Sequence, residues 1–223
     1  AYIDHTKEIN SVYALIPIIV YVFNKEGKNL SQLEIKKIIK WFYYSQIRQR
    51  YISQLQGKLD KDIKIVVNQE NPFDVMLNMI AAERPLEISK DEFVGVGVSH
   101  ALWGLMKFYF KSNDAICFST GINIRKNMGK KYDLENDHIF AWSALRDNGY
   151  GRSNKHKYQL AQEITNRSIL TSIANRIKSD QPAYDFLSGV KENYPNALKL
   201  QCIPNNTELW KLDNYEKFLD QRR

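Results

Sequence analysis

The fold is best predicted from Leu134-Glu135-Asn136-Asp137-His138-Ile139-Phe140, together with Asn166-Arg167-Ser168-Ile169-Leu170-Thr171-Ser172-Ile173-Ala174-Asn175-Arg176-Ile177-Lys178-Ser179-Asp180. The first stretch predicts a strand that carries Asp137 and His138. The second predicts a strand near Ser168–Thr171 and then a helix from about Ser172 to Val190, which carries Asn175. Side chains of neighbouring strand residues point to opposite faces, so Asp137 and His138 would approach a substrate from different directions.

This arrangement suits the hydrolysis of a phosphodiester, which needs a base to deprotonate water and a divalent cation against the scissile phosphate. His138 is the candidate base, and Asp137 is a candidate metal ligand. Asn175 is well placed as a second oxygen ligand. Two oxygen ligands with open water positions suit Mg²⁺, or Mn²⁺ in its place. Each residue alone also has a structural explanation, a surface pair for Asp137-His138 and a helix cap for Asn175.

The same residues carry a family resemblance. Asp-His-Ile, followed by Asn-x-x-x-Leu-Thr and Asn-x-x-Lys-Ser, resembles the HNH (ββα-metal) nuclease motif, and is most similar to the C-terminal nuclease domain of GmrSD-type, modification-dependent restriction endonucleases. The flanks resemble that domain more loosely, through Trp41-Phe42-Tyr43, Arg50-Tyr51-Ile52-Ser53 and Leu59-Asp60-Lys61-Asp62 before the motif, and Gln201-Cys202-Ile203-Pro204, Glu208-Leu209-Trp210 and Tyr215-Glu216-Lys217-Phe218-Leu219 after it.

The resemblance implies a role for each matching residue. His138 would be the general base, and Asp137 and Asn175 would hold the metal. Asn166 would be the middle asparagine, which braces the loop and the orientation of His138, while Arg176 and Lys178 would face phosphates. One departure is Ala141-Trp142, which stands where the family usually has a proline. The whole protein would then restrict modified foreign DNA in the bacterial cytoplasm.

Substrate selection is expected to lie elsewhere. The family places a nucleotide-hydrolysing domain before the nuclease domain, and this sequence contains no GxxxxGK[ST] phosphate-binding loop. The sequence begins at Ala1 and ends on Glu216–Arg223, which resembles a helix cut short. We therefore expect a C-terminal fragment of a larger protein, with the missing N-terminal domain as its partner.

Charge favours a polyanionic partner. The 223 residues include 32 Lys and Arg against 25 Asp and Glu, a formal net charge of +7. Between Arg146 and Lys178 the only acidic residues are Asp147 and Glu163, and the candidate DNA-contacting residues there are Arg152, Lys155, Lys157, Arg167, Arg176 and Lys178. Such a segment can bind a phosphate backbone without reading bases. The alternative for any one of these residues is a solvated surface position.

The first half predicts a helical bundle. Apolar spacing indicates helices over residues 6–24 and 31–56, with a capping box at Ser31 and Glu34 and an end at Gly57. A weaker helix should end near Glu83, and the apolar run from Phe93 to Phe110 should form a core helix. We therefore expect a mainly α protein, with a helical support domain over residues 1–118 and a small α+β nuclease domain with the ββα-metal motif over residues 119–223.

Other classes are disfavoured. The longest apolar run, Tyr13 to Phe23, is too short to span a bilayer and lacks the layout of a signal peptide. Two distant cysteines, Cys117 and Cys202, indicate no disulfide framework and fit a reducing cytoplasm. Two alternatives stay open, a catalytically idle DNA-binding module of the same fold and a self-standing HNH nuclease. The sequence leaves undecided the modification recognised, the oligomeric state, nicking against double-strand cleavage, and DNA against RNA.

Overall fold

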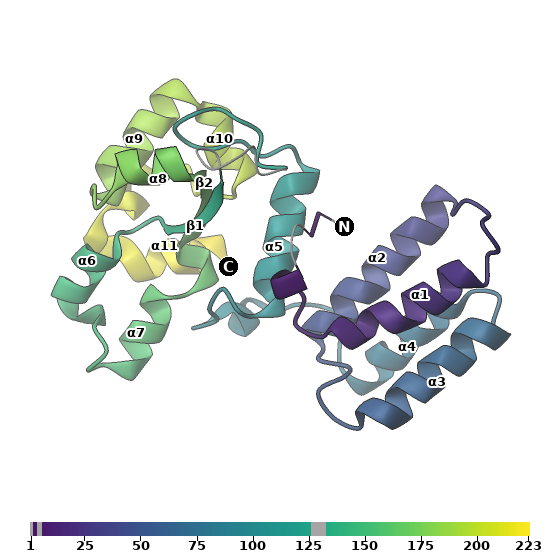
Figure 1. The fold of residues 1–223 in the computed structure, drawn as a ribbon. Helices are drawn as coiled ribbons and strands as arrows, with labels where there is room; N and C mark the ends of the chain where they lie inside the picture. The colour runs from purple at the N-terminus through teal and green to yellow at the C-terminus, as the bar shows by residue number, and fades with distance from the viewer. Residues whose placement is uncertain (1, 4–5, 126–132) are drawn as a thin grey trace. The chain divides into compact units, whose positions relative to one another are not determined.

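A computed structural model describes residues 2–3, 6–125 and 133–223. The chain is mostly helical with a small two-stranded antiparallel sheet, which confirms the expected mainly α class with a small β part (Figure 1). It forms two compact units, one of Ile3–Ile88 with Ser99–Leu105 and the other of Ser89–Val98 with Met106–Arg223. Among the described helices, none has the length and apolar character that a bilayer crossing requires.

In the first unit α1 packs on α3, and α2 packs on α4 (Figure 1). Their bounds are α1 Leu15–Phe23, α2 Gln32–Ile47, α3 Leu55–Asn68 and α4 Pro72–Glu83. Two short 3-10 turns, Thr6–Glu8 and Val12–Ala14, precede α1, so the expected helix over residues 6–24 is regular only in its second half. The capping box is confirmed, because the Ser31 hydroxyl accepts from Glu34 N and the Glu34 carboxylate accepts from Ser31 N.

The expected end of the second helix at Gly57 is wrong. Helix α2 ends at Ile47, and Gly57 lies in the first turn of α3. Gln49 and Gln54 between the two helices have positive φ angles, 55° and 53°. This break turns Arg50 inward, where its guanidinium donates to both oxygens of the buried Asp62 carboxylate at 2.6 and 2.5 Å.

The apolar run from Phe93 to Phe110 is helical only in its second part, α5 Ala101–Ser112. A 3-10 turn, Lys90–Phe93, precedes it, and Gly95 adopts a left-handed φ of 70°. Gly95 N donates to the Glu163 carboxylate, and Val96 O accepts from Ile164 N at 2.7 Å. In a helix, these backbone groups of Gly95 and Val96 would form hydrogen bonds within the helix itself. The helix predicted from the apolar run therefore does not begin until Ala101.

The second unit contains the two-stranded sheet. Strand β1, Leu134–His138, pairs antiparallel with β2, Arg167–Thr171, so the expectation of two strands at these places is confirmed. The helices of this unit are α6 Trp142–Leu145, α7 Lys155–Ala161, α8 Ser172–Lys178, α9 Ala183–Asn193, α10 Pro195–Leu200 and α11 Tyr215–Arg222. The predicted boundary near residue 118 falls inside this unit, because Phe118 packs on Phe186 and the Cys117 thiol accepts from Thr171 N.

The predicted single helix from Ser172 to Val190 is two helices. Ser179 ends α8 with a left-handed φ of 48°, and Pro182 immediately precedes α9. Proline lacks a backbone N–H and disfavours helical geometry in the residue before it, which explains the break between the two helices.

The outer edge of β2 is closed by side chains instead of a third strand. Gln201, which is fully buried, accepts from Ile169 N at 2.8 Å and donates to Ile169 O at 3.0 Å. The buried Arg222 guanidinium donates to the carbonyls of Thr165 and Arg167, each at 2.6 Å, and to those of Gln201 and Cys202. An isolated two-stranded ribbon is marginal in water, so these contacts explain how so small a sheet is held.

Candidate active site

Strand β1 presents its acidic and basic side chains to different neighbours. Glu135 and Asp137, two residues apart, contact Asn175 and Lys178 of α8. His138 contacts Gln162 and Arg167 instead. This is the alternation expected of a strand, and it places a histidine and two carboxylates within one short element.

His138 is held between two polar partners. Its Nδ1 lies 3.1 Å from an Arg167 guanidinium nitrogen, and its Nε2 lies 3.3 Å from Gln162 Oε1. A guanidinium can only donate, so Nδ1 accepts, and the ring proton belongs on Nε2, from which it reaches Gln162. Burial and then the Arg167 charge lower the pKa of His138 to about 3. The imidazole is therefore neutral at physiological pH, as a base must be.

This pKa leads to an expected dependence of stability on pH in the metal-free protein. Unfolded His138 would titrate near 6.5 and folded His138 near 3, so the unfolded state binds the extra proton between these values. Acidification from pH 6.5 toward 3 should therefore reduce the free energy of unfolding, with a slope approaching about 1.4 kcal/mol per pH unit.

The measurement is urea unfolding in EDTA across this range, for the wild type and for His138→Asn. The wild type should lose stability relative to the variant as the pH falls. Parallel curves for the two proteins would contradict the neutral state assigned to His138.

Asp137 is paired with a buried lysine. Lys178 Nζ lies 2.8 Å from Asp137 Oδ2 and donates to the His138 carbonyl at 2.6 Å, and its side chain is only 1% exposed. Burial raises the pKa of Asp137, and the lysine charge opposes this. Lys178 is therefore not a surface phosphate contact, and the expectation drawn from the resemblance is wrong. The ion pair with Asp137 holds the Lys178 ammonium in the interior.

An unpaired hydroxyl lies at the same place. The buried Ser168 Oγ has no hydrogen-bond partner among the described residues, and Ser168 stands directly opposite Asp137 in the sheet. A buried hydroxyl without a partner favours a water or a cation at this position.

Asn175 lies one helical turn before Lys178, and its amide donates to Glu135 Oε2 at 2.5 Å. Glu135 was missed from the sequence, although its spacing of two residues from Asp137 would have indicated the same strand face. Two carboxylates and an amide are hard oxygen donors of the kind that Mg²⁺ prefers, so the residues fit a divalent cation. Over the described part of the chain, no three His, Cys, Asp or Glu side chains cluster closely enough to hold a metal by themselves.

Asn166 braces the end of β1, the place that the resemblance implies for it. It is fully buried, and its Oδ1 accepts from Phe140 N at 2.9 Å. Its amide donates to Phe140 O at 3.3 Å and to Ala161 O at 3.2 Å, and its own carbonyl accepts from Ile139 N. The asparagine thus fixes the two residues that follow His138. Ala141-Trp142, in place of the family's proline, directly follow this clamp.

Arg167 is turned inward rather than toward solvent. It is 9% exposed, donates to Gln162 Oε1 at 2.7 Å and contacts the imidazole of His138. Arg167 was expected on an exposed DNA-binding surface, and this expectation is wrong. In the register of the sheet Arg167 stands opposite His138, on the same face. Gln162, which had no signal in the sequence, completes this arrangement.

The remaining candidate DNA contacts lie at the surface of the second unit. Arg176 on α8, Lys155 at the start of α7 and Arg152 in the turn before it are exposed, and Lys157 is half-buried. The Lys157 ammonium lies 5.1 Å from the centre of the Tyr150 ring. These groups are available to a polyanion, whereas Arg167 and Lys178 are engaged inside.

No family model, curated protein or solved structure matches the chain.

Proposed function

We propose that this chain is a metal-dependent endonuclease of the HNH type that hydrolyses phosphodiester bonds in DNA. The observation that carries the proposal is the juxtaposition, on β1, of a half-buried, neutral His138 with the oxygen donors Asp137 and Glu135, against Asn175 of α8. A base beside a set of hard oxygen ligands is what metal-assisted attack by water requires.

In this proposal His138 accepts a proton from the attacking water. Only Nδ1 has a lone pair directed toward a displaceable group, because Nε2 carries the ring proton toward Gln162. Arg167 must therefore leave Nδ1 before the base can act. A phosphate diester offers the guanidinium a better, charged partner than a neutral imidazole, so substrate binding itself would expose the base.

Asp137 and Asn175 would hold the divalent cation, with Glu135 beside them. When bound, Mg²⁺ or Mn²⁺ supplies positive charge against the scissile phosphate and the leaving oxygen. Lys178 already balances part of the charge of Asp137, so a single added divalent cation suits the two carboxylates better than a second metal would.

DNA is the proposed partner because the net charge is +7 and the unit that holds the site exposes cations, Arg152, Lys155 and Arg176 among them. The resemblance to GmrSD-type restriction endonucleases extends the proposal to modified foreign DNA, a bacterial cytoplasm and a nucleotide-hydrolysing domain in the same protein. That extension depends on the sequence motif alone.

The metal requirement provides a test. Cleavage of plasmid DNA should rise with Mg²⁺ concentration, and Asn175→Ala should raise the half-maximal concentration by roughly tenfold or more, since one of few protein ligands is lost. The matched control is Asn68→Ala, an exposed asparagine of α3 that is expected to leave the metal requirement unchanged. Cleavage that is indifferent to metal, or absent at every concentration, would overturn the proposal.

The second candidate is a catalytically idle DNA-binding module. Two contacts favour it, because Lys178 neutralises Asp137 and Arg167 covers His138 Nδ1. Retardation of DNA on a gel by a protein that never cuts it, with Mg²⁺ or Mn²⁺ present, would select this alternative.

A further inference from the structure

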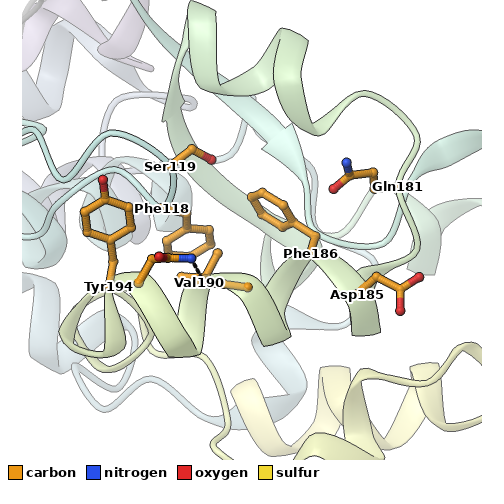
Figure 2. A pocket seen from close by; sticks show the side chains of 9 residues that line it. Phe118, Ser119, Gln181, Asp185, Phe186, Val190 and Tyr194 are labelled. Carbon is orange, nitrogen blue, oxygen red and sulfur yellow. Dashed lines mark hydrogen bonds between the residues drawn. The ribbon is translucent and has the colours of Figure 1, made fainter.

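A cavity of about 320 Å³ lies in the second unit between α9 and the residues around Phe118, and Figure 2 shows its lining. Its floor is apolar and aromatic, formed by Phe118, Phe186 and Val190, which are 1%, 8% and 3% exposed. The two phenylalanine rings are tilted by 50° with their centres 6.2 Å apart. This volume and this floor are typical of a pocket for a small flat molecule.

Polar groups stand at the rim. Gln181 and Asp185 lie beside Phe186 at one end of the pocket, and Tyr194 lies at the other (Figure 2). Gly121 leaves the space that the Tyr194 ring occupies, since a Cβ at that position would lie 2.8 Å from it. The Asp185 carboxylate can only accept hydrogen bonds, whereas the Gln181 amide can donate and accept. A ligand with a flat ring and an amino group on its edge would satisfy this rim.

The pocket shares a wall with the candidate active site. The Phe186 ring lines the pocket and also makes a cation–π contact with Lys178, whose ammonium lies 5.5 Å from the ring centre. Lys178 in turn pairs with Asp137 and the His138 carbonyl. A molecule in the pocket therefore lies one aromatic ring away from the residues proposed to cut DNA.

We propose that this pocket binds a single nucleobase, unstacked from the DNA strand that the neighbouring site cuts, and that it favours bases with an exocyclic amino group over thymine. The inference rests on the proposed function for the identity of the strand. Unstacked bases are commonly held between aromatic side chains and recognised at their edges by polar ones, and a carboxylate is a suitable acceptor for an amino group.

The test uses 2-aminopurine deoxyriboside, a neutral fluorescent nucleoside, as the probe. Its fluorescence anisotropy should rise on titration with the wild-type protein. Gly189→Leu adds a side chain at a pocket-lining position of helix α9, where a Cβ meets nothing within 4 Å. The variant should therefore fold at least as well and bind the nucleoside roughly tenfold or more weakly.

Gly57→Leu in α3 is the matched control, because it makes the same substitution at an open helical position of the first unit that does not line the pocket. Deoxyadenosine and deoxycytidine should displace the probe better than thymidine. No anisotropy change up to the solubility limit, equal binding by Gly189→Leu, or displacement by choline instead of nucleosides would overturn the inference.

Plasmid cleavage is measured on the same samples, so that the two proposals fail separately. Nucleoside binding without any cleavage would support the nucleobase pocket and contradict the proposed nuclease activity. Metal-dependent cleavage by a protein that binds no nucleoside would support the nuclease activity and contradict the nucleobase pocket.

Discussion

His138→Ala is expected to reduce the single-turnover rate of DNA cleavage in Mg²⁺ by about 10²–10⁴-fold, the range typical of a lost general base. The remaining cation could still polarise the phosphate, but no other neutral imidazole lies at β1 among the described residues. The variant should fold, because the lost contacts are two polar ones at a half-buried ring. The measurement is cleavage of an end-labelled duplex, with products separated on a denaturing gel.

His156→Ala is the matched control for this experiment. His156 is an exposed histidine on α7 in the same unit, and its loss should leave the rate within a few-fold of the wild type. If both variants cut as fast as the wild type, His138 is not the base. If both lose activity equally, the effect comes from the basic surface and not from proton transfer.

Arg222→Met is expected to lower the free energy of unfolding by about 3 kcal/mol or more. The substitution keeps much of the side-chain volume, but it leaves the buried carbonyls of Thr165, Arg167 and Gln201, and the part-buried carbonyl of Cys202, without their shared donor. Two of these carbonyls flank the start of β2, so cleavage should weaken together with stability. Burial lowers the pKa of Arg222 to about 10, and the guanidinium still stays charged at neutral pH.

Urea unfolding followed by circular dichroism gives the comparison. Lys217→Met on the same helix is the matched control, since Lys217 is exposed, and it should change the free energy of unfolding by less than about 0.5 kcal/mol. Arg222→Lys should fall between the two, because one ammonium cannot reach all four carbonyls. Equal stability of Arg222→Met and Lys217→Met would contradict the anchoring role.

The strands of the site were predictable because their signal is local. Asp137-His138 and Ser168–Thr171 fall in the paired strands β1 and β2, and Asn175 falls in the helix that follows. The bracing position of Asn166 also follows from the motif, and its hydrogen bonds to Phe140 agree with it.

The charged residues of the site were less predictable, because sequence patterns do not reveal which cations turn inward. Lys178 and Arg167 are expected at the surface by charge alone, yet they are buried against Asp137 and His138. The same limit applies to Arg222, whose partners are four backbone carbonyls distant in sequence. Buried cations depend on tertiary partners, so only the folded arrangement identifies them.

Element boundaries failed where tertiary contacts override helix propensity. Gly57 looked like a helix end, but the break comes earlier, so that Arg50 can reach Asp62. The run beginning at Phe93 looked helical, but Gly95 and Val96 bond to the Glu163 region instead. In both cases a long-range polar contact, which local spacing cannot indicate, decided the backbone path.

The most direct test of the central claim is the conversion of supercoiled plasmid to its nicked or linear form by the purified chain. The protein is incubated with Mg²⁺, with Mn²⁺ and with EDTA, and the products are separated on an agarose gel. The account predicts cleavage with either metal and none with EDTA. Intact plasmid in both metals, from protein that is folded and retards DNA on a gel, would contradict it.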